Sequence, residues 1–156
     1  MTVLPSPSKV CKLRGLKKAR VMSLENLRFK PNAFGTVLMF GGNFGFMGNS
    51  KKTRRLFKKL RRITSKNAIV IAETRDPYKT DNPLHLEYHR LNRSRGKLGG
   101  QTKTRVRFEK TVTKWIEWLI VSKEEMKQII NGTGWKISRF IDSEDAGYVA
   151  IMEKAA

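Results

Sequence analysis

Uninterrupted apolar runs alternate along the chain with segments whose apolar residues recur at helical spacing. Residues 36–40 read Thr-Val-Leu-Met-Phe, and residues 68–73 read Ala-Ile-Val-Ile-Ala-Glu. A run without polar alternation is typical of a parallel strand that is covered on both faces. We therefore predict a buried strand at each run, and a shorter strand at 19–23.

Two amphipathic helices are predicted beside these strands. Asn49 or Ser50 can cap the first, whose apolar side chains face one way while Lys and Arg occupy the other faces. Its core-facing residues are Leu56, Phe57, Leu60 and Ile63. Ser122 and Glu125 form the capping-box pattern that opens the second helix. A strand pair at 135–141 and 148–152 follows, joined by a polar turn.

Residues 77–121 connect these two parts of the chain. We expect a loop over 77–104, because turn formers and basic residues dominate there and no period is visible. Residues 105–121 are rich in β-branched and aromatic residues. Trp115 and Trp118 are three positions apart, which on a strand places them on opposite faces, and we expect both in the core rather than on a base-stacking platform.

The order of elements favours one α/β domain over residues 1–156, with a mostly parallel sheet and an antiparallel C-terminal strand pair. The charge is unusual for such a domain. The 33 Lys and Arg residues exceed the 13 Asp and Glu residues, for a net charge of +20. A field of this sign attracts polyanions, nucleic acid first among them, and RNA is a possible partner. Basic side chains that merely coat solvated helices remain the alternative.

No apolar run approaches the length of a membrane span, and the N-terminus has no secretion-signal pattern. The single cysteine, Cys11, has no partner for an internal disulfide. His85 and His89 are four positions apart, but no third ligand stands out, so we predict no metal site. We expect a cytoplasmic protein.

Four segments together resemble class I S-adenosylmethionine-dependent methyltransferases. Residues 19–29 and 34–38 are similar to the third and fourth motifs of that family. Residues 132–135, Gly-Thr-Gly-Trp, and the last strand at 147–152 are similar to the end of its final helix and its reversed seventh strand. The resemblance implies a partial Rossmann-like sheet, with the family's strand order of third, second, first, fourth, fifth, seventh, sixth. It also implies that residues 77–121 are a substrate-side insertion.

The family grips S-adenosyl-L-methionine with a Gly-rich loop after its first strand and an acidic residue after its second. No such pattern stands at the matching place, so the resemblance implies a truncated domain whose first two strands would lie upstream of Met1. Ser23 and Gly35 stand where the family often has Asp. We therefore expect weak or absent donor binding by the chain alone, and activity only with an N-terminal complement.

The resemblance also implies where ligands would lie. The cofactor-binding residues are Ser23, Leu24 and Glu25 at the adenine edge, and Phe40, Gly41, Gly42, Asn43 and Phe44 beside the sulfonium. The acceptor-binding residues are Arg75, Asp76, Tyr78, Tyr88 and His89. A plain strand-to-helix connection and an ordinary surface loop are the alternatives at these two places. Methyl transfer needs alignment above all, so the sequence indicates no catalytic acid or base and does not identify the methyl acceptor.

Without its two family neighbours, the strand at 36–40 would present unpaired backbone groups at an edge. We expect this edge to accept an N-terminal complement or a second copy of the chain, and residues 19–23 either to pair with 36–40 or to detach. Two functions follow from the sequence. The chain is part of a methyltransferase, or it is a small basic RNA-binding or ribosome-associated protein without catalytic activity.

Overall fold

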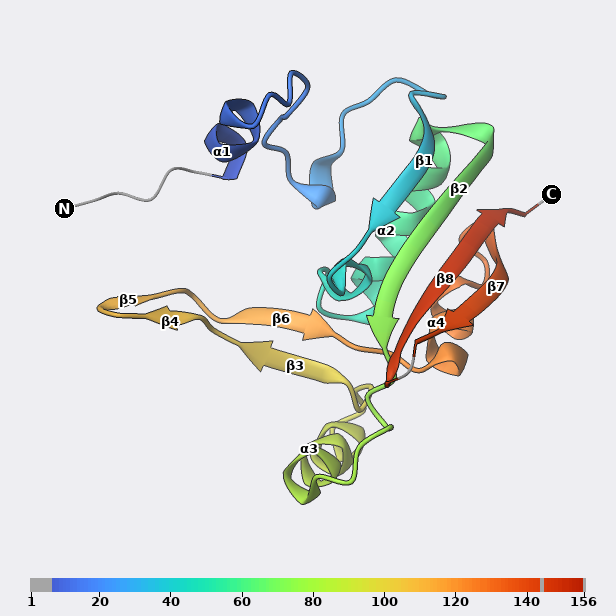
Figure 1. Ribbon diagram of the computed structural model, residues 1–156. Coiled ribbons are helices and arrows are strands. Elements are labelled where there is room, and N and C mark those ends of the chain that lie inside the picture. The colour runs from blue at the N-terminus through green and yellow to red at the C-terminus, as the bar shows by residue number, and fades with distance from the viewer. Residues whose placement is uncertain (1–6, 144, 156) are drawn as a thin grey trace.

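The computed structural model describes residues 7–143 and 145–155, and its centre is a four-stranded sheet in the order β1-β2-β8-β7 (Figure 1). The strands β1 (Phe34–Met39) and β2 (Thr64–Arg75) are parallel, whereas β8 (Gly147–Lys154) runs antiparallel to β2 and to β7 (Trp135–Asp142). This confirms the mixed α/β sheet with an antiparallel C-terminal pair. The order also matches the fourth, fifth, seventh and sixth strands that the resemblance implies.

The two predicted helices are present with the predicted caps. In α2 (Ser50–Ile63), the Asn49 side-chain oxygen accepts a hydrogen bond from the Lys52 amide at 2.9 Å. In α4 (Lys123–Ile130), Ser122 and Glu125 form both bonds of the capping box. Both helices lie on the same face of the sheet (Figure 1). Because the caps are local, the sequence alone is sufficient to place both helix starts.

The core lies between this helical layer and one face of the sheet. Its sheet residues alternate with half-exposed ones along β2 and β8, and they include Val70, Ala72, Ala150 and Met152. On the opposite face, Leu38, Ile71 and Ile151 lie side by side across β1, β2 and β8. Leu38 is 58% exposed, because no described segment covers that face at β1. The expectation of a β1 covered on both faces is therefore wrong.

The segment before β1 contains helix α1 (Pro7–Leu13) and the 3-10 turn η1 (Leu24–Asn26). The predicted strand at 19–23 is wrong, since these residues pair with no strand. A strand is stabilised by hydrogen bonds to a neighbouring strand. β1 lies at the edge of the sheet and pairs with β2 alone, so its outer edge has no partner among the described residues. Residues 19–23 therefore do not pair with residues 36–40, although Met22 and Ser23 still lie beside β1.

The expectation of a loop over residues 77–104 is wrong, because this part of the insertion contains a helix and a strand. Helix α3 (Pro83–Ser94) begins with Asn82 as its N-cap and Pro83 in its first turn, which is the arrangement that favours a helix start. After α3, β3 (Gln101–Thr104) pairs with β6 (Ile116–Leu119), and β4 (Arg107–Phe108) pairs with β5 (Thr111–Val112). These strands form a long hairpin, residues 101–119, that projects away from the sheet (Figure 1) and is called the arm below.

The two tryptophans of the arm are not both in the core. Trp115 is 60% exposed, so its expected burial is wrong, whereas Trp118 is half-buried near the sheet. The difference follows their positions, because Trp115 lies beyond the paired part of β6 and Trp118 lies within it. None of the described helices has the length and apolarity that a membrane span requires.

Candidate functional site

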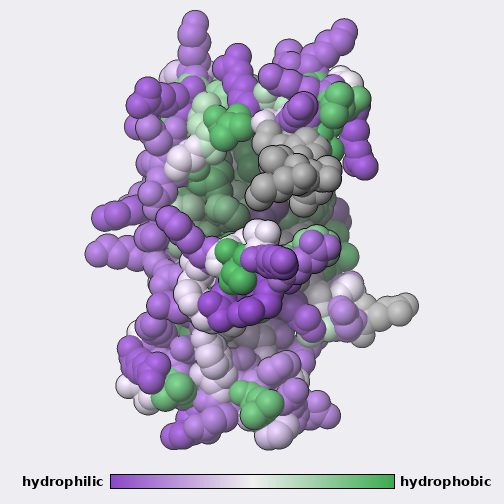
Figure 2. All heavy atoms as spheres, turned by 90° about the vertical axis from the view of Figure 1, so that its left-hand side faces the viewer, coloured by the Kyte–Doolittle hydropathy of each residue, from purple (hydrophilic) through white to green (hydrophobic). Residues whose placement is uncertain are grey.

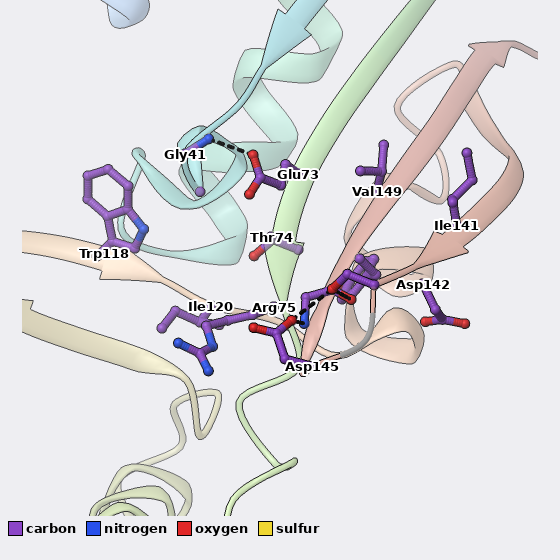
Figure 3. Close-up of a pocket in the computed structure, with 14 residues that line it drawn as sticks. Gly41, Glu73, Thr74, Arg75, Trp118, Ile120, Ile141, Asp142, Asp145 and Val149 are labelled. Atoms are coloured by element: carbon purple, nitrogen blue, oxygen red, sulfur yellow. Dashed lines mark hydrogen bonds between the residues drawn. The ribbon is translucent and has the colours of Figure 1, made fainter.

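A cavity of about 650 Å³ opens where the parallel strands β1 and β2 end (Figure 3). Its walls come from the turn after β1, the end of β2, the base of the arm and the turn between β7 and β8. Open α/β sheets bind ligands in the crevice outside the carboxyl ends of their strands. This cavity, called the strand-end cavity below, therefore lies where the fold places a ligand.

A glycine turn forms the upper wall of the strand-end cavity. Gly41 and Gly42 come one residue after the end of β1 and have φ angles of 63° and 75°, a left-handed conformation that glycine adopts without strain. The amide of Gly41 donates a hydrogen bond of 2.9 Å to the Glu73 carboxylate on β2 (Figure 3). No atom lies within 4 Å of the point where a Gly41 side chain would begin. A ligand can therefore approach this backbone closely, with a carboxylate held beside it.

The arm reaches into the same cavity through Trp118. The indole nitrogen of Trp118 lies 3.3 Å from the point where a side chain on Gly42 would begin. Its ring also meets Phe46 edge to face, with centroids 5.5 Å apart. Sequence reasoning missed Trp118 as a site residue, because its approach to Gly42 spans 76 positions and leaves no local pattern.

A second hollow, of about 610 Å³, runs along the outer edge of β1 and is called the edge groove below. It is lined mainly by apolar residues of η1, β1 and α2, and by the side chains of Ser23 and Asn43. On this side of the molecule, apolar side chains gather in a hollow surrounded by hydrophilic ones (Figure 2). The turn at 41–43 therefore separates two cavities, since Gly41 and Gly42 line one and Asn43 lines the other.

The predicted cofactor residues are divided between these places. Ser23 and Leu24 lie in the edge groove with Asn43. Glu25 and Phe40 line neither cavity, and the Glu25 carboxylate lies 3.8 Å from the Lys52 amine. The structure buries Phe44 in the core, with its ring 5.6 Å from that of Phe57, so Phe44 is not on the cavity wall.

The predicted acceptor residues do converge. Arg75, Asp76, Tyr88 and His89 line a third cavity, of about 430 Å³, between the end of β2, helix α3 and the arm. Tyr78 lies behind this wall, where its hydroxyl donates to the Glu125 carboxylate and its ring meets His89 edge to face. Arg75 and Ile120 line both this α3 cavity and the strand-end cavity. The two cavities are therefore neighbours.

His89, in the wall of the α3 cavity, has a buried ring nitrogen without a hydrogen-bond partner among the described residues. Its side chain is 8% exposed, and Nδ1 has no hydrogen-bond partner within residues 7–143 and 145–155. Burial lowers the pKa of His89, and the charges of Arg93 and His85 lower it further. The lowered pKa favours the neutral imidazole, whose Nδ1 is enclosed in the wall of the cavity. Across the described ranges, no three His, Cys, Asp or Glu side chains gather where they could hold a metal ion.

No family model and no curated protein matches this sequence. Solved structures match it closely in shape. A SAM-dependent methyltransferase from Bacteroides fragilis, in complex with S-adenosyl-L-homocysteine, matches 96% of the chain with a TM-score of 0.76 and 21% identity. SAM-dependent methyltransferases from Methanosarcina mazei and Clostridium acetobutylicum match 94% and 95% of it, with TM-scores of 0.69 and 0.62 and identities of 14% and 10%.

These likenesses show that the chain has a class I methyltransferase fold. Its match spans 59% of the length of the Bacteroides fragilis protein, 76% of the Methanosarcina mazei protein and 69% of the Clostridium acetobutylicum protein. At such low identity the likeness concerns the fold, and function has to be argued from the site.

Proposed function

We propose that the chain supplies the acceptor side of an S-adenosylmethionine-dependent methyltransferase, with the donor lying across the turn at 41–43. The observation that carries this proposal is the position of the turn between two cavities at the carboxyl end of β1. A ligand with an apolar ring at one end and a small charged centre at the other can occupy both. The complex of the Bacteroides fragilis protein with S-adenosyl-L-homocysteine supports the same class of ligand.

The residues around the turn fit such a ligand. On the strand-end side, the Glu73 carboxylate and the Trp118 ring provide the negative charge and the π-face that attract a cationic sulfonium. On the edge-groove side, Leu24 and the apolar wall suit an adenine ring, and the Asn43 and Ser23 side chains can pair with its polar edge. When bound, the donor supplies an electrophilic methyl group.

The α3 cavity is the proposed place of the acceptor, because it shares Arg75 and Ile120 with the strand-end cavity. A neutral His89 can accept a hydrogen bond from the acceptor, or donate one to it. Methyl transfer gains most from holding nucleophile, methyl group and leaving sulfur in line. The residues of this chain would therefore contribute by positioning and by excluding water.

The outer edge of β1 is the proposed attachment site of an N-terminal complement. Its unpaired backbone groups border the edge groove, so an added parallel strand would extend the sheet beside this groove and complete the donor-binding site. Without that strand, the chain contacts the donor from one side only. Binding by the chain alone should accordingly be weak.

This proposal predicts that loss of the Glu73 charge affects S-adenosyl-L-methionine and S-adenosyl-L-homocysteine differently. The two ligands differ by one methyl group and one charge. By NMR titration, S-adenosyl-L-methionine should bind with a dissociation constant of about 1 mM, equivalent to about −4 kcal/mol. Amide shifts should concentrate at residues 23–24 and 41–43, and at Glu73 and Trp118. Glu73→Gln should weaken binding of the cationic donor by about fivefold, or about 1 kcal/mol, because it removes a charge near the sulfonium. The neutral thioether S-adenosyl-L-homocysteine should bind the variant as it binds the parent.

Glu153→Gln is the matched control, since it removes the same charge near the far end of β8. The control should bind both ligands as the parent protein does. Equal losses for both ligands in Glu73→Gln, or shifts that leave residues 41–43 untouched, would contradict the proposed placement. Micromolar binding would show instead that the chain alone contains the complete donor-binding site.

A further inference from the structure

The arm exposes large apolar side chains that no other element covers. Phe108 is 64% exposed, Val106 61% and Trp115 60%. Single exposed apolar residues are normal on a protein surface. Three of them within ten positions of a projecting two-stranded ribbon are more than isolated exposures and favour a binding surface. The arm projects toward the viewer in Figure 2.

The same segment is strongly basic. Its cations are Lys103, Arg105, Arg107, Lys110 and Lys114, against the acidic residues Glu109 and Glu117. All five cations are exposed, and none of them is in an ion pair within the part of the chain that the structure describes. Lys103, Arg105 and Arg107 stand at alternate positions before the tip of the hairpin. The arm therefore combines uncompensated positive charge with uncovered aromatic rings.

One aromatic ring is already held in place by a cation. The guanidinium of Arg105 lies 4.7 Å from the centroid of the Trp115 ring. This contact occupies part of the ring and restricts its rotation, while most of the side chain stays open to solvent. An oriented, exposed indole beside basic groups is the arrangement on which an unpaired base stacks.

We infer that the arm binds single-stranded nucleic acid, with Trp115 stacking on a base and the arm's lysines and arginines contacting phosphates. Charge complementarity favours a polyanion, and the exposed rings favour one whose bases are free to stack. A duplex offers its phosphates but keeps its bases paired, so it would leave Trp115 unused. The inference is independent of the proposed methyl transfer, because binding is measured without a methyl donor.

Fluorescence anisotropy with labelled oligouridylate of about 12 nucleotides tests this inference, a length within the usual range of a single-strand site. Affinity should fall as salt rises, with a logarithmic slope near −0.7 for each phosphate neutralised. Trp115→Ala should weaken binding roughly tenfold, and Trp115→Phe should restore most of the loss because it keeps a stacking ring. Both variants should remain folded, since Trp115 is exposed.

The charge contribution is tested with two matched double variants. Lys110→Gln with Lys114→Gln removes two charges from the arm, and Arg55→Gln with Lys58→Gln removes two exposed charges from α2. The arm variant should reduce both the affinity and the salt slope, whereas the α2 variant should leave most of the affinity intact. Equal losses in the two variants would show attraction by net charge alone and would overturn the inference.

Three further probes define the ligand. Oligothymidylate of the same length should bind as well if stacking and phosphate contacts suffice, and weaker binding would assign the site to RNA. A duplex of the same length should bind less tightly than either single strand. A duplex that binds tighter, or binding to phosphatidylserine vesicles without binding to any oligonucleotide, would overturn the inference.

Discussion

Replacing Gly45 by alanine is expected to lower the free energy of unfolding by about 3 kcal/mol, at the upper end of the usual cost of overpacking. Gly45 ends the 3-10 turn η2 (Asn43–Gly45), and an added Cβ would lie 1.7 Å from the Leu119 carbonyl oxygen. Backbone atoms cannot yield as the end of a long side chain can. The base of the arm would have to move away from the turn, although Leu119 is fully buried there.

Urea unfolding followed by circular dichroism measures this loss. Gly35→Ala is the matched control, because its added Cβ would meet only the Ser65 hydroxyl oxygen, at 4.0 Å. The same chemical change should therefore be nearly neutral at Gly35 and severe at Gly45. Equal midpoints for the two variants would show that the contact between η2 and the arm is not formed in solution.

Phe57→Ala is expected to lower the free energy of unfolding by about 3–5 kcal/mol, which is a large fraction of the stability of a typical domain. The Phe57 side chain is fully buried at the centre of α2, and its ring packs against that of Phe44. Its carbonyl oxygen also accepts a hydrogen bond of 3.0 Å from the Trp135 indole. The cavity left by the ring would therefore loosen the junction of α2 with β7.

The control for this variant is Phe108→Ala, which removes the same ring from the exposed surface of the arm. It should change the free energy of unfolding by less than about 0.5 kcal/mol, as is usual at exposed sites. Denaturant titrations of both variants give the comparison directly. A Phe108→Ala protein as unstable as Phe57→Ala would mean that the arm packs against the domain rather than projecting from it.

The parts of this fold that the sequence predicts are those with local signals. Asn49 and the Ser122–Glu125 pair place two helix starts, and apolar runs place β1 and β2, because caps and periodicity act over a few residues. Helix α3 also has such a signal, in Asn82 and Pro83, but only His89 and Asn92 of the helix are buried, so no apolar period marks its length.

Other features depend on contacts between distant segments. Residues 19–23 have the composition of a strand, yet a strand needs a neighbour and none is present at the edge of β1. The bond from the Gly41 amide to Glu73 and the approach of Trp118 to Gly42 join segments 32 and 76 positions apart. Composition says nothing about such pairings. The sequence therefore predicts which residues lie near the strand ends. It does not predict how those residues are divided among separate cavities.

The row of exposed Leu38 and half-buried Ile71 and Ile151 affects how the molecule behaves in concentrated solution. At low ionic strength, the net charge of +20 makes copies of the chain repel one another over about 30 Å, which keeps this apolar row from meeting its like. At about 1 M salt the same repulsion reaches only about 3 Å. The basic surface should therefore oppose self-association through this face of the sheet, and we expect concentrated salt to favour it.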